Sequence, residues 1–238
     1  MPSATSSSAP TRSYRSATRE RRARETRERI LAAASIQFLR SGYVATTMRT
    51  VAGAAGTSVP TLELVFGTKS QLLRATISFA IRGDAASVPM LQRDWAVSAE
   101  AAGSVADFLA IVGRVLAEAA QRSAGLVVAA FEAANVDESM HALADQLRAQ
   151  RAETAAWIVE GLMKRSSLRA ETTRDQAIDI VWLLMDPHGF CTLTRDRGWS
   201  ARQFERWFTD SVARLLLSAT ETAAHRATPT HNPEERTS

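Results

Sequence analysis

Small polar and charged side chains stand at the starts of three segments between residues 46 and 82. Thr47 and Ser58 directly precede segments with helical apolar spacing, and Lys69 is the first residue of another. Backbone N–H groups at a helix start, with a neighbouring hydroxyl or ammonium group, are donors that suit phosphate oxygens. These residues therefore predict contacts with a phosphate backbone. A plainer interpretation stays open, in which Thr47 and Ser58 only cap the helices that follow them.

Four predicted helices would position these donors. The first runs from about Arg19 to Arg40 and ends at Gly42, which suits a left-handed helix cap. A short helix follows Thr47, and Gly56 supplies a tight turn before the next short helix, which begins after Ser58. The fourth runs from Lys69 to about residue 82. Two short helices joined by a tight turn predict a helix-turn-helix that faces DNA.

The third of these helices, "VPTLELVF", has an unusual composition for a DNA reader. It offers mainly apolar side chains where polar or basic groups usually contact bases, so thymine methyl groups are its natural targets and hydrogen bonds to bases should be few. Arg49, Thr61 and the arginines before the first helix would then supply affinity. The predicted DNA contacts are Thr47, Arg49, Ser58, Val59, Pro60, Thr61, Glu63, Leu64 and Lys69.

Charge is distributed unevenly along the 238 residues. Residues 1–83 hold 13 Lys and Arg against 4 Asp and Glu, a net charge of +9, whereas residues 84–238 hold 16 against 21, a net charge of −5. A basic first third suggests a polyanionic partner at that end of the chain. The arginines near the N-terminus, between residues 12 and 24, would form a flexible arm that lies in a minor groove or along phosphates, or else a solvated extension.

An ordered set of motifs resembles the TetR (tetracycline-repressor) family of bacterial regulators. It comprises "RILAAASIQFLRSGY", "ATTMRTVAGAAGTS", Thr61–Leu62, Phe66 and "TKSQLL", and the later "DIVWLLMDPHGF" is also similar to many members. The resemblance implies a one-component transcriptional regulator, a repressor that binds a palindromic double-stranded DNA operator as a homodimer and is released by a small-molecule effector.

The third helix departs from the family pattern. The family usually has two aromatic residues before the phenylalanine, and often a lysine and a glycine before the threonine. Where the family has the two aromatic residues, this chain has Glu63 and Val65. Where the family has lysine and glycine, it has Val59 and Pro60. The departures put sequence-specific base reading in doubt. They leave open an alternative function, an interaction protein on the same fold whose third helix contacts a protein.

We predict an all-α fold, with an N-terminal helix-turn-helix domain and a C-terminal helical domain for effector binding and dimerisation. The expected parts are a disordered arm at 1–18, the DNA-binding domain at 19–83, the effector domain at 84–223 and a disordered tail at 224–238. Residues 84–103 should be a connection with at most a short turn of helix. Later helices are expected near 104–121, 124–135, 137–164, 173–193 and 200–223.

The resemblance implies that the C-terminal part binds an effector and pairs two subunits. Candidates for an apolar effector pocket are Phe108, Phe131, Trp157 and Met163, although ordinary core is the simpler interpretation of each. The last two helices carry apolar residues on more than the one face that packs in the core of their own chain, which predicts that a second apolar face is buried against a partner subunit. The expected dimer contacts are Ile178, Val181, Met185, Phe204, Trp207, Phe208, Val212 and Leu215.

Other functional classes find little support in the sequence. We expect no catalytic site, metal or cofactor, because no triad, phosphate loop or metal-ligand set is present. His188 and Cys191 are three residues apart and share a helix face, but two possible ligands without a third are weak evidence for a metal site. A single cysteine, no signal-peptide pattern and no apolar run of about 20 residues favour a soluble cytoplasmic protein without a membrane partner.

Overall fold

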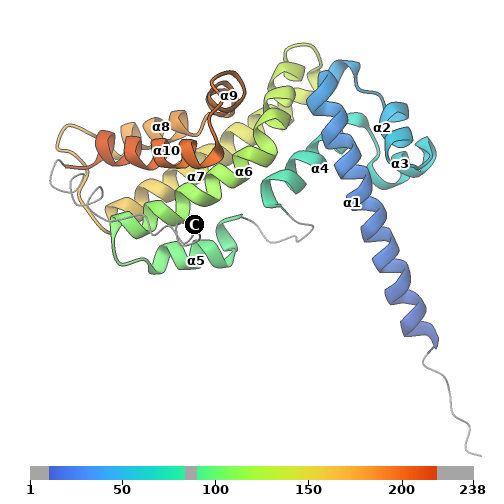
Figure 1. Cartoon of the computed structure of the whole chain (residues 1–238), viewed down its shortest axis with the longest axis horizontal. Coiled ribbons are helices and arrows are strands. Elements are labelled where there is room, and N and C mark those ends of the chain that lie inside the picture. Colours follow the sequence, from blue (N-terminus) through green and yellow to red (C-terminus); the bar gives the residue numbers. More distant parts are fainter. Residues whose placement is uncertain (1–10, 84–89, 219–238) are drawn as a thin grey trace, which may run out of the picture. The chain divides into compact units, whose positions relative to one another are not determined.

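The computed structural model describes residues 11–83 and 90–218 (Figure 1). This part of the chain is helical and has no β-strand apart from one isolated antiparallel pairing between Leu168 and Leu217, which confirms the predicted all-α class. The α-helices are α1 (Thr11–Ala45), α2 (Met48–Ala54), α3 (Val59–Phe66), α4 (Lys69–Arg82), α5 (Asp94–Ala101), α6 (Val105–Ala134), α7 (His141–Met163), α8 (Arg174–Leu184), α9 (Pro187–Cys191) and α10 (Ala201–Leu216).

The chain divides into two compact units after Thr76, within α4. The first unit packs α1 to α3 and the start of α4 around one core. Buried side chains come from all four helices and include Ile30, Phe38, Val51, Leu62 and Leu72. Burying a side chain of this size contributes about 1.5 to 3 kcal/mol, so these contacts hold the two short helices in place.

Glycines separate the first three helices as expected. Gly42 has φ 67° and interrupts the helical geometry of α1 near its end, and Gly56 has φ 60° in the turn between α2 and α3. Residues with a Cβ rarely adopt positive φ, so glycine suits both positions. The hydroxyl of buried Thr46 donates to the carbonyls of Gln37 and Gly42, which ties the end of α1 to the start of α2.

Helix α1 begins earlier than expected. Residues 11–18 belong to the segment expected to be disordered, yet they are helical and continuous with the rest of α1. The segment contains no glycine or proline after Pro10, and helix propagation adds one hydrogen bond for each residue fixed once a helix exists. Residues 1–10 lie outside the described part of the chain, as does the whole tail expected to be disordered at 224–238.

The second unit is built around α6, which contacts α5, α7, α9 and α10 (Figure 1). The break expected near residue 125 is wrong, because α6 runs without interruption from Val105 to Ala134. A glycine inside a helix costs only about 1 kcal/mol relative to alanine. The burial of neighbouring Leu126 and Ala130 outweighs that cost.

Two more segments of the second unit differ from expectation. The predicted helix at 173–193 is broken after Leu184, because Pro187 cannot continue it and instead opens α9, with Asp186 as the N-cap. The connection expected at 84–103 contains the eight-residue helix α5, and residues 84–89 lie outside the described part. Within the described residues, no helix combines the length and apolar character that a membrane crossing requires.

Candidate nucleic-acid interface

Helix α3 has one buried face and one exposed face. Leu62 and Phe66 pack into the core of the first unit, whereas Leu64 is 87% exposed. Pro60 and Leu64 are four residues apart, so they share the outward face, and Thr61 lies beside them. Glu63 is exposed too, at the edge of that face. The outward surface of α3 is therefore mainly apolar, as its sequence predicts.

Both short helices start with a side-chain cap. The Thr47 hydroxyl accepts a hydrogen bond from Thr50 N at 3.1 Å, and the Thr50 hydroxyl accepts one from Thr47 N at 3.1 Å. At α3, Ser58 Oγ accepts from Thr61 N at 3.2 Å and contacts the Thr61 hydroxyl at 2.8 Å. The capping role of Thr47 and Ser58 is confirmed. Both residues are exposed, so their hydroxyls are also accessible to a phosphate.

Arginines of α1 hold the helix-turn-helix in place. The Arg27 guanidinium lies 4.5 Å from the centroid of the Phe66 ring, which anchors the end of α3. Arg29 Nε donates to the carbonyl of Ala55 at 3.0 Å, just after α2. The sequence did not reveal these two contacts, because Arg27 and Arg29 are part of a run of arginines that all look alike.

Lys69 ties α4 to the end of α1. Its ammonium Nζ donates to the carbonyl of Tyr43 at 2.9 Å and to that of Val44 at 3.4 Å, and it lies 4.1 Å from the centroid of the Tyr43 ring. Cations near a helix C-terminus satisfy carbonyl groups that lack an intrahelical partner. Lys69 thus has a structural role that the sequence did not predict. A phosphate contact by the same ammonium stays a prediction.

We expect Lys69→Met to lower the free energy of unfolding by about 1.5 to 3 kcal/mol, the usual contribution of hydrogen bonds to a charged group. Thermal or urea unfolding of the purified protein would measure the change. Lys164→Met is the matched control, because Lys164 is the other lysine of the chain, is exposed, and lies at the end of α7. Equal stability of the two variants would contradict a structural role for Lys69.

The four candidate effector residues do not surround one site. Phe108 and Trp157 pack together, with ring centroids 5.7 Å apart, and Trp157 Nε1 donates to Glu100 of α5. Phe131 lies 23 residues after Phe108 on the same helix, about 35 Å away, which is too far to line the same small cavity. Met163 is 46% exposed near the end of α7.

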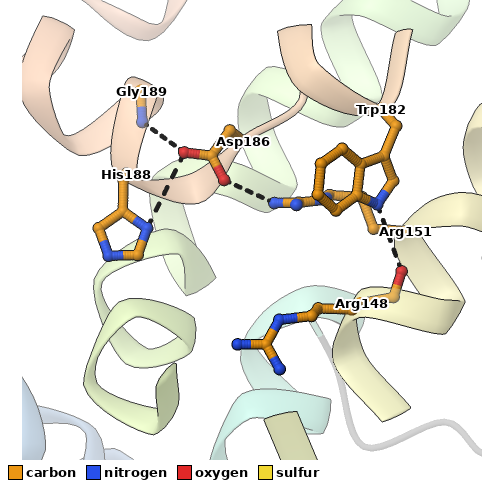
Figure 2. A network of polar contacts seen from close by, with 6 residues as sticks. All are labelled: Arg148, Arg151, Trp182, Asp186, His188 and Gly189. Atoms are coloured by element: carbon orange, nitrogen blue, oxygen red, sulfur yellow. Dashed lines mark hydrogen bonds and ion pairs between the residues drawn. The ribbon is translucent and has the colours of Figure 1, made fainter. Parts of the chain in front are cut away.

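Phe131 contacts His188 instead, at the side of a polar cluster around Asp186 that is drawn in Figure 2. The Asp186 carboxylate accepts from Arg151 Nη1 at 2.8 Å and from Gly189 N at 3.1 Å, and it lies 3.9 Å from His188 Nδ1. The Arg151 guanidinium lies 3.9 Å from the centroid of the Trp182 ring. The His188 ring stacks on Phe131 with centroids 6.1 Å apart. This cluster joins α6, α7, α8 and α9.

The cluster contains the titratable side chains of Asp186 and His188, and Cys191 lies at the end of the same short helix α9. Among the described residues, no group of three or more His, Cys, Asp or Glu side chains is placed to hold a metal ion. Burial raises the pKa of the Cys191 thiol, which disfavours the nucleophilic thiolate. The His188 side chain is 51% exposed, and its contacts in the structure are with Asp186 and Phe131.

The predicted dimer residues fall into two groups. Val181, Phe204, Phe208 and Val212 are buried in the core of their own unit and so do not form an outer surface. The others remain at least partly accessible: Ile178, Met185 and Trp207 are half-buried, and Leu215 is 47% exposed. Leu183 of α8, which the sequence did not single out, is 66% exposed. Apolar surface on α8 and α10 is therefore available.

Comparisons with known proteins agree with the helix-turn-helix. Residues 30–76 match the family "Bacterial regulatory proteins, tetR family". A TetR transcriptional regulator from Chloroflexus aurantiacus has a similar structure, with a TM-score of 0.57, 21% identity and coverage of 83% of this chain and 100% of that one. The search of curated proteins by sequence found no match.

Two further solved structures are similar. The ketosteroid transcriptional regulator KstR2 of Mycobacterium tuberculosis has a TM-score of 0.56 and 16% identity, over 81% of this chain and 95% of that one. A candidate transcriptional regulator of Saccharomonospora viridis in complex with choline has a TM-score of 0.59 and 18% identity, over 82% and 98%. Residues 30–76 therefore form the helix-turn-helix domain of the tetR family, and the chain has the fold that TetR-family transcriptional regulators share.

Proposed function

We propose that this protein is a one-component transcriptional repressor in the cytoplasm, which binds a palindromic DNA operator as a homodimer and is released by a small-molecule effector. The observation that carries the proposal is the exposed face of α3, framed by the capped, exposed starts of α2 and α3. Thr47, Arg49 and Ser58 would bind phosphates, while Thr61 and Leu64 would face bases. The two α3 helices of a dimer would occupy half-sites about 34 Å apart.

The effector would bind in the second unit. Phe108 and Trp157 are the two predicted pocket residues that the fold brings together, and Trp95 packs edge-on against Trp157 with centroids 5.5 Å apart. Aromatic rings of this kind bind apolar or cationic small molecules. An effector held there would stabilise a state in which the spacing of the two α3 helices no longer matches the operator.

The function is tested by selection of bound fragments from the source genome at moderate salt, with and without cell extract. Recovery of a palindromic site, and its loss when an active extract is added, would support the proposal. Failure to select any sequence, with a folded dimer, would overturn it. That outcome would favour an interaction protein, a second candidate function to which the 87% exposure of Leu64 on α3 also points.

Dimerisation is proposed through α8 and α10. We expect Leu183→Asp with Leu215→Asp to convert the dimer to a folded monomer, because each substitution places a charge in the proposed apolar interface. Sedimentation at micromolar concentration would measure the mass. Leu39→Asp is a matched control, since Leu39 is 53% exposed on α1. A wild-type protein that sediments as a monomer would contradict the proposal.

Phe204 and Phe208 are unsuitable for this test, although both are predicted interface residues. They are 4% and 0% exposed within a single chain. An aspartate at either position would bury an unpaired charge in the core of the second unit. The expected result is loss of the fold, which would say nothing about the interface.

A further inference from the structure

Three aromatic side chains of the second unit pack together on and next to α5. The Trp157 ring centroid lies 5.7 Å from that of Phe108, on α6, and 5.5 Å from that of Trp95, on α5. We call these three residues the aromatic cluster. Phe108 is 0% exposed, and α5 packs on α6 (Figure 1). A ligand can therefore reach the Phe108 ring only after one of the covering helices moves.

Of α5, α6 and α7, α5 is the least firmly packed. It has eight residues, of which Ala96 and Ala99 are buried and Trp95 is half-buried. Alanine side chains bury little apolar area, so they contribute little free energy to holding α5 on α6. By contrast, α6 and α7 have 30 and 23 residues and bury leucine and valine side chains. An isolated helix of eight residues is marginal in water, so α5 would lose its helical hydrogen bonds on leaving α6.

One arginine holds the C-terminal end of α5. Arg165, two residues after the end of α7, donates from Nε to the Ala102 carbonyl at 2.9 Å. Its Nη2 donates to the carbonyls of Ala99 and Glu100, at 2.8 and 2.7 Å. The last carbonyls of a helix lack α-helical partners, so a guanidinium placed there stabilises them. Its Nη1 donates to the Gly161 carbonyl at 2.6 Å, which ties the same group to α7.

The same guanidinium also covers the Phe108 ring. Arg165 Cζ lies 4.5 Å from the centroid of that ring. On α7, Gly161 leaves room for the ring, because a Cβ at this position would collide with it. The ring is therefore held against α7, and a movement of Arg165 would uncover it without displacing it.

The aromatic cluster contains a buried donor that is not used. Trp95 Nε1 is buried and has no hydrogen-bond partner among the described residues, whereas Trp157 Nε1 donates to Glu100 at 3.1 Å. A buried N–H group without a partner costs free energy, and such groups are rare in folded proteins. An oxygen atom of a ligand placed beside Trp95 would remove this cost.

We infer that α5 is a lid over the aromatic cluster and that Arg165 is the latch that closes it, an inference that rests on the proposed effector site. The ligand is an apolar molecule with an oxygen acceptor, such as a carbonyl group, for Trp95 Nε1. A cation fits less well, because the guanidinium that already lies on Phe108 would repel it. Release of α5 precedes ligand entry, and renewed closure excludes water from the bound ligand.

Amide hydrogen exchange tests the lid, with Arg169→Gln as the matched control for Arg165→Gln. Arg169 Nη1 donates to the Arg214 carbonyl at 2.8 Å, so it makes the same kind of contact with α10 rather than α5. We expect Arg165→Gln to accelerate exchange at residues 94–102 by at least about tenfold, since α5 loses three hydrogen bonds to a charged group. Exchange within α6 should stay as in the wild type, and Arg169→Gln should leave α5 unchanged.

In the wild type, α5 should exchange faster than α6, because a lid opens without unfolding of the whole unit. If α5 exchanges as slowly as α6, or if Arg165→Gln accelerates exchange equally in both helices, α5 belongs to the core and the inference is wrong. The wild-type comparison decides the question even if Arg165→Gln fails to fold.

Ligand entry is tested with the dye prodan, an apolar naphthalene that has a ketone oxygen and no hydrogen-bond donor. Stopped-flow fluorescence should show that Arg165→Gln raises its association rate by the same factor as the exchange of α5, because entry depends on the open fraction. Trp95→Phe keeps an aromatic ring but removes the donor, so it should weaken equilibrium binding of prodan by about twofold to tenfold.

An association rate that Arg165→Gln leaves unchanged would contradict the lid. Equal affinity of Trp95→Phe and the wild type, or a wild type that binds no prodan, would contradict the assigned ligand class. Neither measurement requires DNA, so their outcome is independent of the operator selection that tests the proposed function.

Discussion

Asp186→Ala should lower the free energy of unfolding by about 3 kcal/mol, the lower end of the usual cost of removing one partner from a buried ion pair. The Arg151 side chain is only 11% exposed, and its Nη1 lies 2.8 Å from Asp186 Oδ1. Its Nε is buried without a hydrogen-bond partner. Without the carboxylate, the Arg151 guanidinium would keep its contact with the Trp182 ring but would lose the negative charge that it pairs with (Figure 2).

The same substitution removes a helix cap. Asp186 Oδ2 accepts a hydrogen bond from Gly189 N, at the start of α9. Loss of an aspartate N-cap costs about 1 kcal/mol on its own. Asp186→Asn separates the two contributions, because asparagine can still cap α9 but carries no charge. We expect the free energy of unfolding of Asp186→Asn to lie between that of the wild type and that of Asp186→Ala.

Urea unfolding would measure these changes, with Asp145→Ala as the matched control. Asp145 pairs with Arg148 at 3.0 Å, but its side chain is 76% exposed, and exposed pairs contribute at most about 1 kcal/mol. The double variant Arg151→Met with Asp186→Asn should be more stable than Asp186→Ala, because no unpaired charge is left. If Asp145→Ala and Asp186→Ala lowered the free energy of unfolding equally, the Arg151–Asp186 ion pair would contribute no more to stability than an exposed pair.

The first unit could be predicted from sequence because its signals are local. Thr47 and Ser58 are caps, and Gly42 and Gly56 have the positive φ expected of them. These features depend on residues within one helical turn of each other. The role of Lys69 was missed because it depends on Tyr43 and Val44, 26 and 25 positions earlier in the chain.

The second unit was harder to predict because packing between distant segments decides it. Gly125 is a residue type that often ends a helix, but α6 packs against several other helices and runs through this position. Phe204 and Phe208 have the sequence pattern of an interface. They are nevertheless in the core, because α10 packs on α6 and α8 within the same chain. Periodicity identifies an apolar face without indicating which surface covers it.

Glu63→Ala should relax DNA specificity at one base pair of each half-site, by about 1 to 3 kcal/mol. Glu63 is exposed on α3, one residue from buried Leu62 and three before buried Phe66. It is four residues after half-buried Val59, at the edge of the outward face that Pro60 and Leu64 share. A carboxylate in this position can accept a hydrogen bond from cytosine N4, or it can repel phosphates.

The expected energies favour base reading. Repulsion between exposed charges at a wet, salt-screened interface is worth about 1 kcal/mol or less, whereas a good base contact discriminates by about 1 to 3 kcal/mol. The neighbours Val59, Leu64 and Val65 have no side-chain donor or acceptor, and the Thr61 hydroxyl is already paired with Ser58 Oγ, so Glu63 has the most to gain from a hydrogen bond to a base edge. Loss of that contact should therefore affect one position of the half-site and leave the others unchanged.

The measurement is a set of binding curves for the operator and for variants with each base pair of one half-site replaced. Glu63→Gln is the matched control: it removes the charge but keeps an amide oxygen that can accept from cytosine. If Glu63 reads a base, Glu63→Gln should retain part of the preference that Glu63→Ala loses. If both variants instead bind every sequence more tightly with the preferred site unchanged, Glu63 acts by repulsion, and its carboxylate limits the non-specific binding that the arginine-rich domain would otherwise have.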